Sequence, residues 1–455
     1  MSCTTRLLLT LLLLLGTRHS QAGAPAAADA QLEPGKALNI INMLMVHDVV
    51  SPPVAARYYA YTMLGAYAIV AAHDKNLPAL PSLVKSFPAT LRLDTVKARY
   101  DYRVAAYYSI LETARLLLPS GETLADEQAS LLQELGKAGF KPGILAQSVR
   151  VGKLAAAAAV GFSKTDRYSR LSALKRYSPL KEDGKWYPTP PAYMEPVEPN
   201  WKTIRPMMID SAKQFRPALP VPFSRDTASA FHRQAKAVYH VSKQLTADQT
   251  QVAQFWDCNP FAVNTAGHMS IGFKKISPGG HWMNIAALVS KQVKLGFDNT
   301  VVVLCLEGIT LMDAFISCWE MKYVTNRIRP ETYINRYVDV KWQPMLQTPP
   351  FPEYTSGHAV VSNASAEVLT YLLGDNIAYV DDTEIPFGSG ERAFTSFRQA
   401  ATEASISRFY GGIHYMESID NGNDQGKRIG NHIVAQLRSA GIKPLATNKG
   451  VGYRR

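Results

Sequence analysis

Apolar residues run along most of the chain in stretches that favour α-helices. No stretch alternates apolar and polar residues for long enough to predict a substantial β-sheet. The expected fold class is therefore all-α, made of helical bundles. The helices are predicted over residues 38–50, 54–72, 103–118, 125–135, 142–162, 228–245, 247–256, 283–295, 300–327 and 359–373.

Two segments interrupt this pattern. Residues 179–222 contain ten prolines, so they cannot be helical throughout, while their aromatic and arginine content argues against disorder. We interpret them as an ordered strap that lies across the bundle and shapes the pocket entrance, or as a plain connector. Residues 257–282 form a second irregular segment, in which His268 and His281 are candidate halide-side or substrate-side groups, or partners in loop hydrogen bonds. Residues 421–424 are predicted to form a turn before the last helix.

The first 22 residues have the pattern of a secretory signal. One cation, Arg6, precedes the apolar run 7–15, and the small residues Ser20 and Ala22 frame a cleavage site before Gly23. An uncleaved amino-terminal anchor is the alternative. Cleavage predicts a secreted or periplasmic protein.

The length and composition are those of a globular protein. A chain of 455 residues has room for two or three domains, and no low-complexity linker separates them. We expect an N-terminal helical bundle over residues 23–227, which includes the strap, and a C-terminal bundle over residues 228–455. Beyond the signal, no stretch reaches about 18 unbroken apolar residues, which predicts no membrane span in the mature chain.

The net charge and the cysteine content limit the kinds of partner and of covalent cross-link that the chain can have. The formal net charge of +12 becomes +10 once Arg6 and Arg18 leave with the signal, and a basic protein attracts anions. The cations are scattered and no nucleic-acid motif is present, which argues against a nucleic-acid partner. Cys258, Cys305 and Cys318 form a sparse set without metal-ligand spacing, in which at most one internal disulfide is possible. The oligomeric state is not indicated.

Lys322 and Arg329 are the first candidates for an oxyanion site. They are seven residues apart in a stretch free of Gly and Pro, which is nearly two helical turns, so a helix would project both cations from one face. Pro330 is expected to end this helix. Taken alone, such a pair is usually a solvated helix face.

Ser356, Gly357 and His358 come just before the helix predicted at residues 359–373. A helix start offers free N–H groups and a partial positive charge, which suit a phosphate-like anion. Gly357 allows close approach of the backbone, and the Ser356 hydroxyl adds a donor.

Arg408 and His414 complete the candidate site. The guanidinium of Arg408 is a planar fork for oxygen atoms, and His414 follows two glycines and can act as a nucleophile or as a direct ligand. Each stretch alone is ordinary. Together, in one order and without a carboxylate that would repel an anion, they predict a single oxyanion pocket.

These stretches resemble the three-part signature of the superfamily that joins type 2 phosphatidic acid phosphatases with vanadium-dependent haloperoxidases. The matching parts are Lys322-x6-Arg329-Pro330, Ser356-Gly357-His358 and Ser407-Arg408-x5-His414, with Thr355 where the family usually has proline. Blocks at residues 51–54, 187–193, 215–217, 255–256 and 279–282 look like those of soluble bacterial haloperoxidases. The resemblance covers about residues 38–440 and favours the haloperoxidase branch.

The resemblance implies two four-helix bundles with the anion site in the C-terminal bundle, and vanadate as cofactor. His414 would bind vanadium, and His358 would be the acid–base group. Lys322 would also polarise the bound peroxide, so that a halide can attack it. The substrates would be hydrogen peroxide and a halide. The oxygen atoms of vanadate would be held by Lys322, Arg329, Ser356, the Gly357 amide and Arg408.

The same pocket suits two other functions. Phosphate and vanadate are both tetrahedral oxyanions, so a periplasmic phosphomonoesterase that acts on phosphate esters is the alternative enzyme. In it, His414 would attack phosphorus to give a phosphohistidine, and His358 would protonate the leaving alcohol. A non-catalytic oxyanion-binding protein is the third possibility.

Two positions depart from the family pattern. The carboxylate that commonly lies four residues after His414 is replaced by Ser418, which leaves Glu417 and Asp420 nearby; Asp420 is the candidate for fixing the imidazole tautomer. Where haloperoxidases often carry an aspartate, this chain has Asn259, whose neutral amide would leave the pocket more positive.

Overall fold

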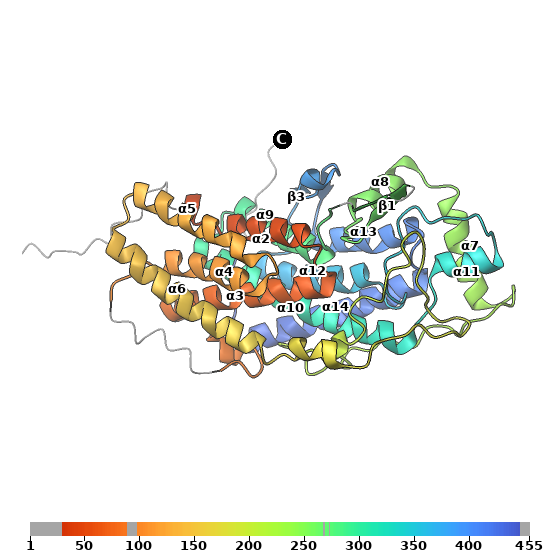
Figure 1. The fold of residues 1–455 in the computed structure, drawn as a ribbon, viewed down its shortest axis with the longest axis horizontal. Coiled ribbons are helices and arrows are strands. Elements are labelled where there is room, and N and C mark those ends of the chain that lie inside the picture. Colours follow the sequence, from red (N-terminus) through yellow and green to blue (C-terminus); the bar gives the residue numbers. More distant parts are fainter. Residues whose placement is uncertain (1–29, 89–97, 267–268, 273, 446–455) are drawn as a thin grey trace, which may run out of the picture.

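The computed structural model describes residues 30–88, 98–266, 269–272 and 274–445. The predicted signal and His268 lie outside these residues. The described chain is mostly helical, as predicted, and Figure 1 shows α5 and α6 towards one end of the long axis, with α7 and α11 at the other. The α-helices are α2 (Pro34–His47), α3 (Pro52–His73), α4 (Tyr102–Leu117), α5 (Leu124–Lys137), α6 (Pro142–Ser163), α7 (Ala230–Ser242), α8 (Ala247–Phe255), α9 (Pro278–Gln292), α10 (Phe297–Thr325), α11 (Pro330–Tyr337), α12 (Gly357–Leu373), α13 (Phe397–Tyr410) and α14 (Met416–Ser439).

Local sequence explains where these helices begin. Proline occupies the first turn of α2, α3, α6, α9 and α11, where its missing N–H costs nothing. The helix predicted at 283–295 begins five residues earlier, at Pro278, because Ser277 caps it by accepting a hydrogen bond from Gly280 N. The end of the segment predicted as irregular is therefore helical, and His281 lies in the first turns of α9.

Helix α10 runs through the centre of the molecule. It packs on α3, which in turn packs on α4 and α6. It also packs on α12, which in turn packs on α13 and α14. One continuous cluster of buried apolar side chains extends through both groups. A Cβ atom at Gly308 would come within 3.0 Å of the α3 backbone, so glycine permits this close approach. The domain boundary predicted between residues 227 and 228 stays a prediction.

Two helical stretches, Pro142–Ala173 and Phe297–Thr325, are long and apolar enough to cross a membrane by length and composition alone. The second is wholly buried in the bundle, as the core helix of a soluble protein is. The expected absence of a membrane span stays a prediction.

Two short antiparallel hairpins accompany the helices. Strands β1 (Val263–Ala266) and β2 (Met269–Gly272) form one, and β3 (Tyr379–Asp381) and β4 (Arg392–Phe394) form the other. Strands of three or four residues are too short for alternation to reveal them, so the sequence pattern did not predict them.

The proline-rich segment 179–222 lies along the C-terminal part of α10. Its Trp186 N donates to Asn326 O at 2.7 Å, and its Gly184 O accepts from Ile328 N at 3.0 Å. Val197 O accepts from the indole of Trp319 in α10. The residues that line the anion cavity described below come from other segments, so this strap holds the turn after α10 rather than the cavity wall.

Helices α12 and α14 pack closely along a row of glycines. A Cβ atom at Gly426 would lie 2.3 Å from Val360 O, and one at Gly430 would lie 2.8 Å from Ala364 O. The turn predicted at residues 421–424 is wrong: these residues are helical and lie within α14. Gly422, within this segment, belongs to the face of α14 that packs on α12.

Candidate anion site

Lys322 and Arg329 do not share a helix, contrary to the expectation from their spacing. Helix α10 ends at Thr325, and Asn326 follows in the left-handed conformation, with φ of 48°, as the C-cap. Arg329 precedes Pro330, which starts α11 instead of ending a helix. Lys322 therefore lies in the last turn of α10, and a tight connection brings Arg329 back to it.

Lys322 is fully buried and held by backbone oxygens. Its Nζ donates to the carbonyls of Pro352, Glu353 and Thr355 at 3.2, 3.3 and 2.5 Å. Thr355, at the position of the family's usual proline, thus contributes its carbonyl. Burial, reinforced by the nearby Arg329 charge, lowers the pKa of Lys322 to about 8.

The two arginines are held in the same way. Arg329 Nε donates to Phe351 O at 2.9 Å and its Nη1 to Ile413 O at 2.8 Å. Arg408 Nη2 donates to Trp256 O at 2.6 Å. Burial lowers the pKa of Arg329 to about 10 and also lowers that of Arg408.

Among the described residues, none of these three buried cations forms a salt bridge with a carboxylate. Carbonyl oxygens satisfy their hydrogen-bonding groups only in part, since Arg329 Nη2 is buried without a partner. Three concentrated charges shielded from water strongly favour an anionic occupant.

The N-terminus of α12 adds polar donors. Ser356 is the N-cap, its hydroxyl is buried without a hydrogen-bond partner in the described part of the chain, and Gly357 is the first helical residue. A Cβ atom at Gly357 would meet only Trp319 at 3.8 Å and Lys322 at 4.0 Å. Glycine is therefore not required for the backbone conformation. It keeps open the space in front of the helix N-terminus, where the dipole favours an anion.

His414 is oriented by Glu353. Its Nδ1 lies 2.8 Å from Glu353 Oε1, and this carboxylate oxygen also accepts from Tyr415 N at 3.1 Å. The other oxygen of Glu353 lies 3.4 Å from Arg327. The interpretation of Asp420 as the supporting carboxylate is wrong, because α14 turns Asp420 to the exposed surface.

The contact with Glu353 fixes the proton on Nδ1 of His414. The lone pair of Nε2 then points towards the cations, with Arg329 Nη1 at 3.1 Å. Burial, followed by the charges of Arg329 and Lys322, lowers the pKa of His414 well below its usual value. A neutral imidazole with a free Nε2 lone pair is the form that binds a metal centre or attacks phosphorus.

His358 lies in the first turn of α12 and is partly buried. Burial and then the charge of Arg408 lower its pKa well below the usual value, so the imidazole is neutral near pH 7. It hydrogen-bonds the backbone of Trp256, and its buried Nε2 has no hydrogen-bond partner among the residues that the structure describes.

A narrow cavity, with about 40 Å³ of space for water-sized molecules, is lined by Gly357, His358, Arg408 and His414, whereas Lys322, Arg329 and Ser356 are not part of its lining. Asp257 also lines it, but its carboxylate pairs with Lys275 at 2.5 Å. The Asn259 side chain accepts from Phe261 N through Oδ1, while its buried Nδ2 has no partner. The polar lining includes Asn259, Gln347, Gly357, His358, Arg408 and His414.

Sequence reasoning missed Glu353 because it lies 61 residues before His414, and no spacing rule links two groups that only the fold brings together. A weak indication existed, since Glu353 is the carboxylate nearest in sequence to Ser356. Arg327 was also missed; it bridges Glu353 and Glu417, with 2.7 Å to the latter. His281 is not part of the cavity lining.

The burial of Lys322 predicts a stability change with pH in the anion-free protein. Below pH 8 Lys322 is charged in both the folded and the unfolded protein, so folding must remove the ammonium group from water, which lowers the stability. Above pH 10.5 Lys322 is neutral in both states, and this cost is absent. At about 1.4 kcal/mol per pH unit, a window of about 2.5 units amounts to roughly 3 to 4 kcal/mol. The unfolding free energy of the protein relative to Lys322→Met should therefore rise between pH 8 and 10.5, measured by denaturant titration. A difference that stays constant with pH would contradict the burial of a charged lysine.

Comparisons with known proteins agree with this architecture. A family model for the VCPO second helical-bundle domain matches residues 337–440. The crystal structure of a bacterial vanadium-dependent iodoperoxidase is 39% identical, with a TM-score of 0.83, over 90% of this chain and 96% of that one. A bacterial vanadium-dependent chloroperoxidase in its holo form shares the fold at 14% identity, with a TM-score of 0.64, over 86% of this chain and 94% of that one. Curated proteins gave no significant match.

The chain therefore belongs to the vanadium-dependent haloperoxidase family, as its sequence motifs predicted. Its all-α fold is that of the family, and the relative at 39% identity supports an oxidoreductase.

Proposed function

We propose that this protein is a vanadium-dependent haloperoxidase of the periplasm or the extracellular space, which oxidises a halide with hydrogen peroxide. The observation that carries the proposal is the group of three buried cations, Lys322, Arg329 and Arg408, which form no salt bridge with a carboxylate of the described chain. They face a neutral histidine whose Nε2 lone pair is directed towards them.

The residues present fit vanadate. An oxyanion would satisfy donors that are otherwise buried without partners, namely Arg329 Nη2 and the Ser356 hydroxyl. It would also compensate the buried positive charge. His414 Nε2 would be the ligand to vanadium, and the oxygens would be held by Lys322, Arg329, Arg408, Ser356 and the Gly357 amide. When bound, vanadate supplies a Lewis-acidic centre that activates hydrogen peroxide for attack by a halide.

The protein's own groups bind and move protons. Glu353 keeps the His414 proton on Nδ1, so that Nε2 stays available as a ligand. An anion in the pocket offsets the cationic field and raises the pKa of His358. His358 Nε2 can then accept the proton that hydrogen peroxide releases on binding and return it as water leaves. Hydrogen peroxide, halide and one proton give hypohalous acid and water.

Iodide is the halide to test first, because the solved structure at 39% identity is named an iodoperoxidase. The aromatic residues Trp319 and Phe351 line the cavity and limit the water around a polarisable anion.

One experiment separates the enzyme classes. The purified protein is divided into orthovanadate-loaded and vanadate-free samples, and both are assayed for peroxide-dependent iodide oxidation and for release of phosphate from an aryl phosphate ester. We expect iodide oxidation only in the loaded sample, and the same activity in the periplasmic or extracellular fraction of the producing cells. Phosphate release by the vanadate-free sample, inhibited by vanadate and without iodide oxidation, would identify a phosphatase instead. Inactivity in both assays would favour a non-catalytic oxyanion-binding protein.

A further inference from the structure

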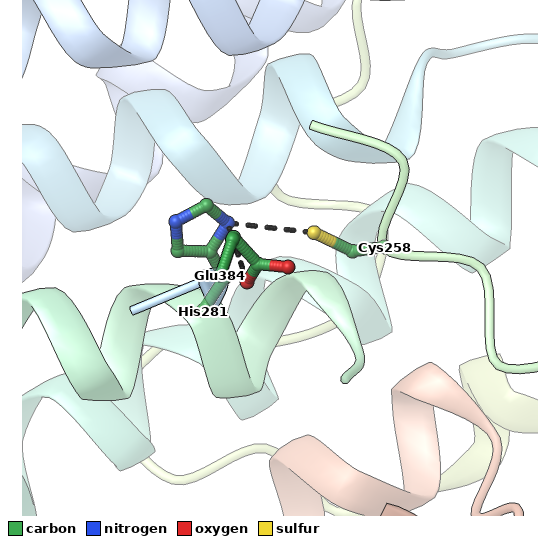
Figure 2. A group of neighbouring side chains, drawn as sticks. All are labelled: Cys258, His281 and Glu384. Carbon is green, nitrogen blue, oxygen red and sulfur yellow. Dashed lines mark hydrogen bonds and ion pairs between the residues drawn. The ribbon is translucent and has the colours of Figure 1, made fainter. Parts of the chain in front are cut away.

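A second cluster of buried polar side chains lies beside the anion site. Cys258, His281 and Glu384 converge in Figure 2, and each is at most 3% exposed. They come from three separate segments: the loop after α8, the first turns of α9, and the residue that precedes the short 3-10 helix η6 (Ile385–Phe387). Their potential ligand atoms all lie within 4.8 Å of one another.

The two separations that involve His281 are those of ligands around a small cation. His281 Nδ1 lies 3.4 Å from Cys258 Sγ and 3.3 Å from Glu384 Oε1. Bond lengths of about 2.3 Å to sulfur and about 2.0 to 2.1 Å to nitrogen and oxygen in a tetrahedral zinc site correspond to edges of roughly 3.6 and 3.3 Å. A direct N–H···O hydrogen bond is shorter, usually about 2.9 to 3.0 Å. Glu384 Oε1 in fact has no hydrogen-bond partner among the described residues.

His281 is prepared to use Nδ1 as a ligand. Its other ring nitrogen, Nε2, lies 2.8 Å from Asp381 Oδ2, and the second oxygen of this carboxylate accepts from the Thr383 hydroxyl at 2.7 Å. A proton held on Nε2 by Asp381 leaves the Nδ1 lone pair facing the cysteine and the glutamate. Metal-bound histidines almost always have such a carboxylate or carbonyl behind them. The Trp256 ring stacks on the imidazole at 4.5 Å and fixes its plane.

We propose that Cys258, His281 and Glu384 bind one Zn²⁺ ion, with Asp381 as the positioning residue for His281. A thiolate, an imidazole and a carboxylate are the donor types that zinc takes, and the thiolate disfavours magnesium and calcium. Three protein ligands leave one position for water. This site adjoins the anion pocket, whose lining it shares through Cys258, and its occupant is a cation.

The ion would link the three segments that carry Cys258, His281 and Glu384 beside the anion site. The loop that carries Cys258 also supplies the Trp256 carbonyl, which holds Arg408. Cys258 lines the anion cavity as well, so the cavity gives a path by which an ion reaches the site. Zinc binding at Cys258 would thereby stabilise the position of Arg408 without taking part in the reaction.

A metal-free arrangement of the same residues makes a different prediction. Although burial alone would lower it, the charges of Glu384 and Asp381 raise the pKa of His281 well above its usual value. A protonated His281 between two carboxylates is a closed set of charges that needs no ion and keeps Cys258 as a thiol. The zinc-bound and metal-free arrangements can be distinguished by measuring the metal content of the protein and by testing whether the Cys258 thiolate binds the metal.

The test uses the mature chain purified without a polyhistidine tag. Zinc and vanadium are counted together by mass spectrometry after gel filtration, and about one zinc per chain is expected. Chelated protein is then titrated with cobalt(II) chloride, and a charge-transfer absorption from the Cys258 thiolate, with the visible bands of tetrahedral cobalt, is expected. Cys258→Ala should lose the zinc and the charge-transfer band. Asp381→Asn should weaken zinc binding about 10- to 100-fold.

Cys305→Ala is the matched control, because Cys305 is an equally buried thiol in the α10 core and belongs to no cluster of potential metal ligands among the described residues. It should keep the zinc and the cobalt spectrum. Should Cys258→Ala fail to fold, the cobalt spectrum of the unchanged protein still decides, since only a sulfur ligand gives the charge-transfer band. Zinc-free protein whose cobalt complex lacks that band, or zinc retained by folded Cys258→Ala, overturns the proposal. Neither readout depends on halide oxidation.

Discussion

Replacement of His414 by alanine should abolish peroxide-dependent iodide oxidation, with a loss of more than about 100-fold. Loss of a residue that merely supports a metal ligand typically costs about 10- to 100-fold, and His414 Nε2, 3.1 Å from Arg329 Nη1, is itself the proposed ligand. Lys322, Arg329 and Arg408 remain in His414→Ala, so orthovanadate should still bind, though more weakly. Iodide oxidation at saturating vanadate and equilibrium dialysis of vanadate measure the two effects separately.

His240→Ala is the control for this variant, because His240 is exposed at the end of α7. It should match the unchanged protein in both measurements. Halide oxidation that survives in folded, vanadate-loaded His414→Ala would remove His414 from the ligand role. Complete loss of vanadate binding would show that the cations do not hold the anion without the imidazole.

The sequence predicted which residues form the site better than it predicted their local backbone structure. The residue types and order at Lys322, Arg329 and His414 indicated an oxyanion pocket, because several donors without a carboxylate are an uncommon combination. Their spacing suggested one continuous helix, yet Asn326 ends α10 in the left-handed conformation. Helix propensity across residues 300–327 gives no warning of this, since the break is held by the strap through Gly184 and Trp186.

The carboxylates around the site illustrate the limit of spacing arguments. Asp420 was chosen because it lies near His414 in sequence, but the helical periodicity of α14 turns it to solvent. Glu353 precedes α12, and only the packing of α14 against α12 brings it to His414. Similarly, Cys258 and Glu384 have no metal-binding spacing, and three unconnected segments bring them to His281. Long-range pairs of this kind are determined by tertiary packing, which a single sequence does not display.

Glu353→Gln should lower iodide oxidation about 10- to 100-fold while leaving the protein folded and able to bind vanadate. The amide oxygen of glutamine can still accept the Nδ1–H of His414, but without a negative charge it makes the imidazole a weaker ligand. Arg327 keeps Glu417 as a partner, so no buried charge loses every contact. The three cations that hold the anion are unchanged, and removing a nearby carboxylate makes the pocket more positive. The loss should therefore fall on turnover rather than on vanadate affinity.

Two further variants make this expectation specific. Glu353→Ala removes the acceptor as well as the charge and should be less active than Glu353→Gln, because the tautomer of His414 is then no longer fixed. Asp420→Asn changes the exposed carboxylate that sequence proximity favoured and should keep full activity. Iodide oxidation is measured at saturating vanadate, and vanadate affinity is measured in parallel. The rate should decrease from the unchanged protein to Glu353→Gln and then to Glu353→Ala. If Asp420→Asn were impaired and Glu353→Gln were not, the role assigned to Glu353 would be wrong, and the imidazole would have to be oriented from the side of α14.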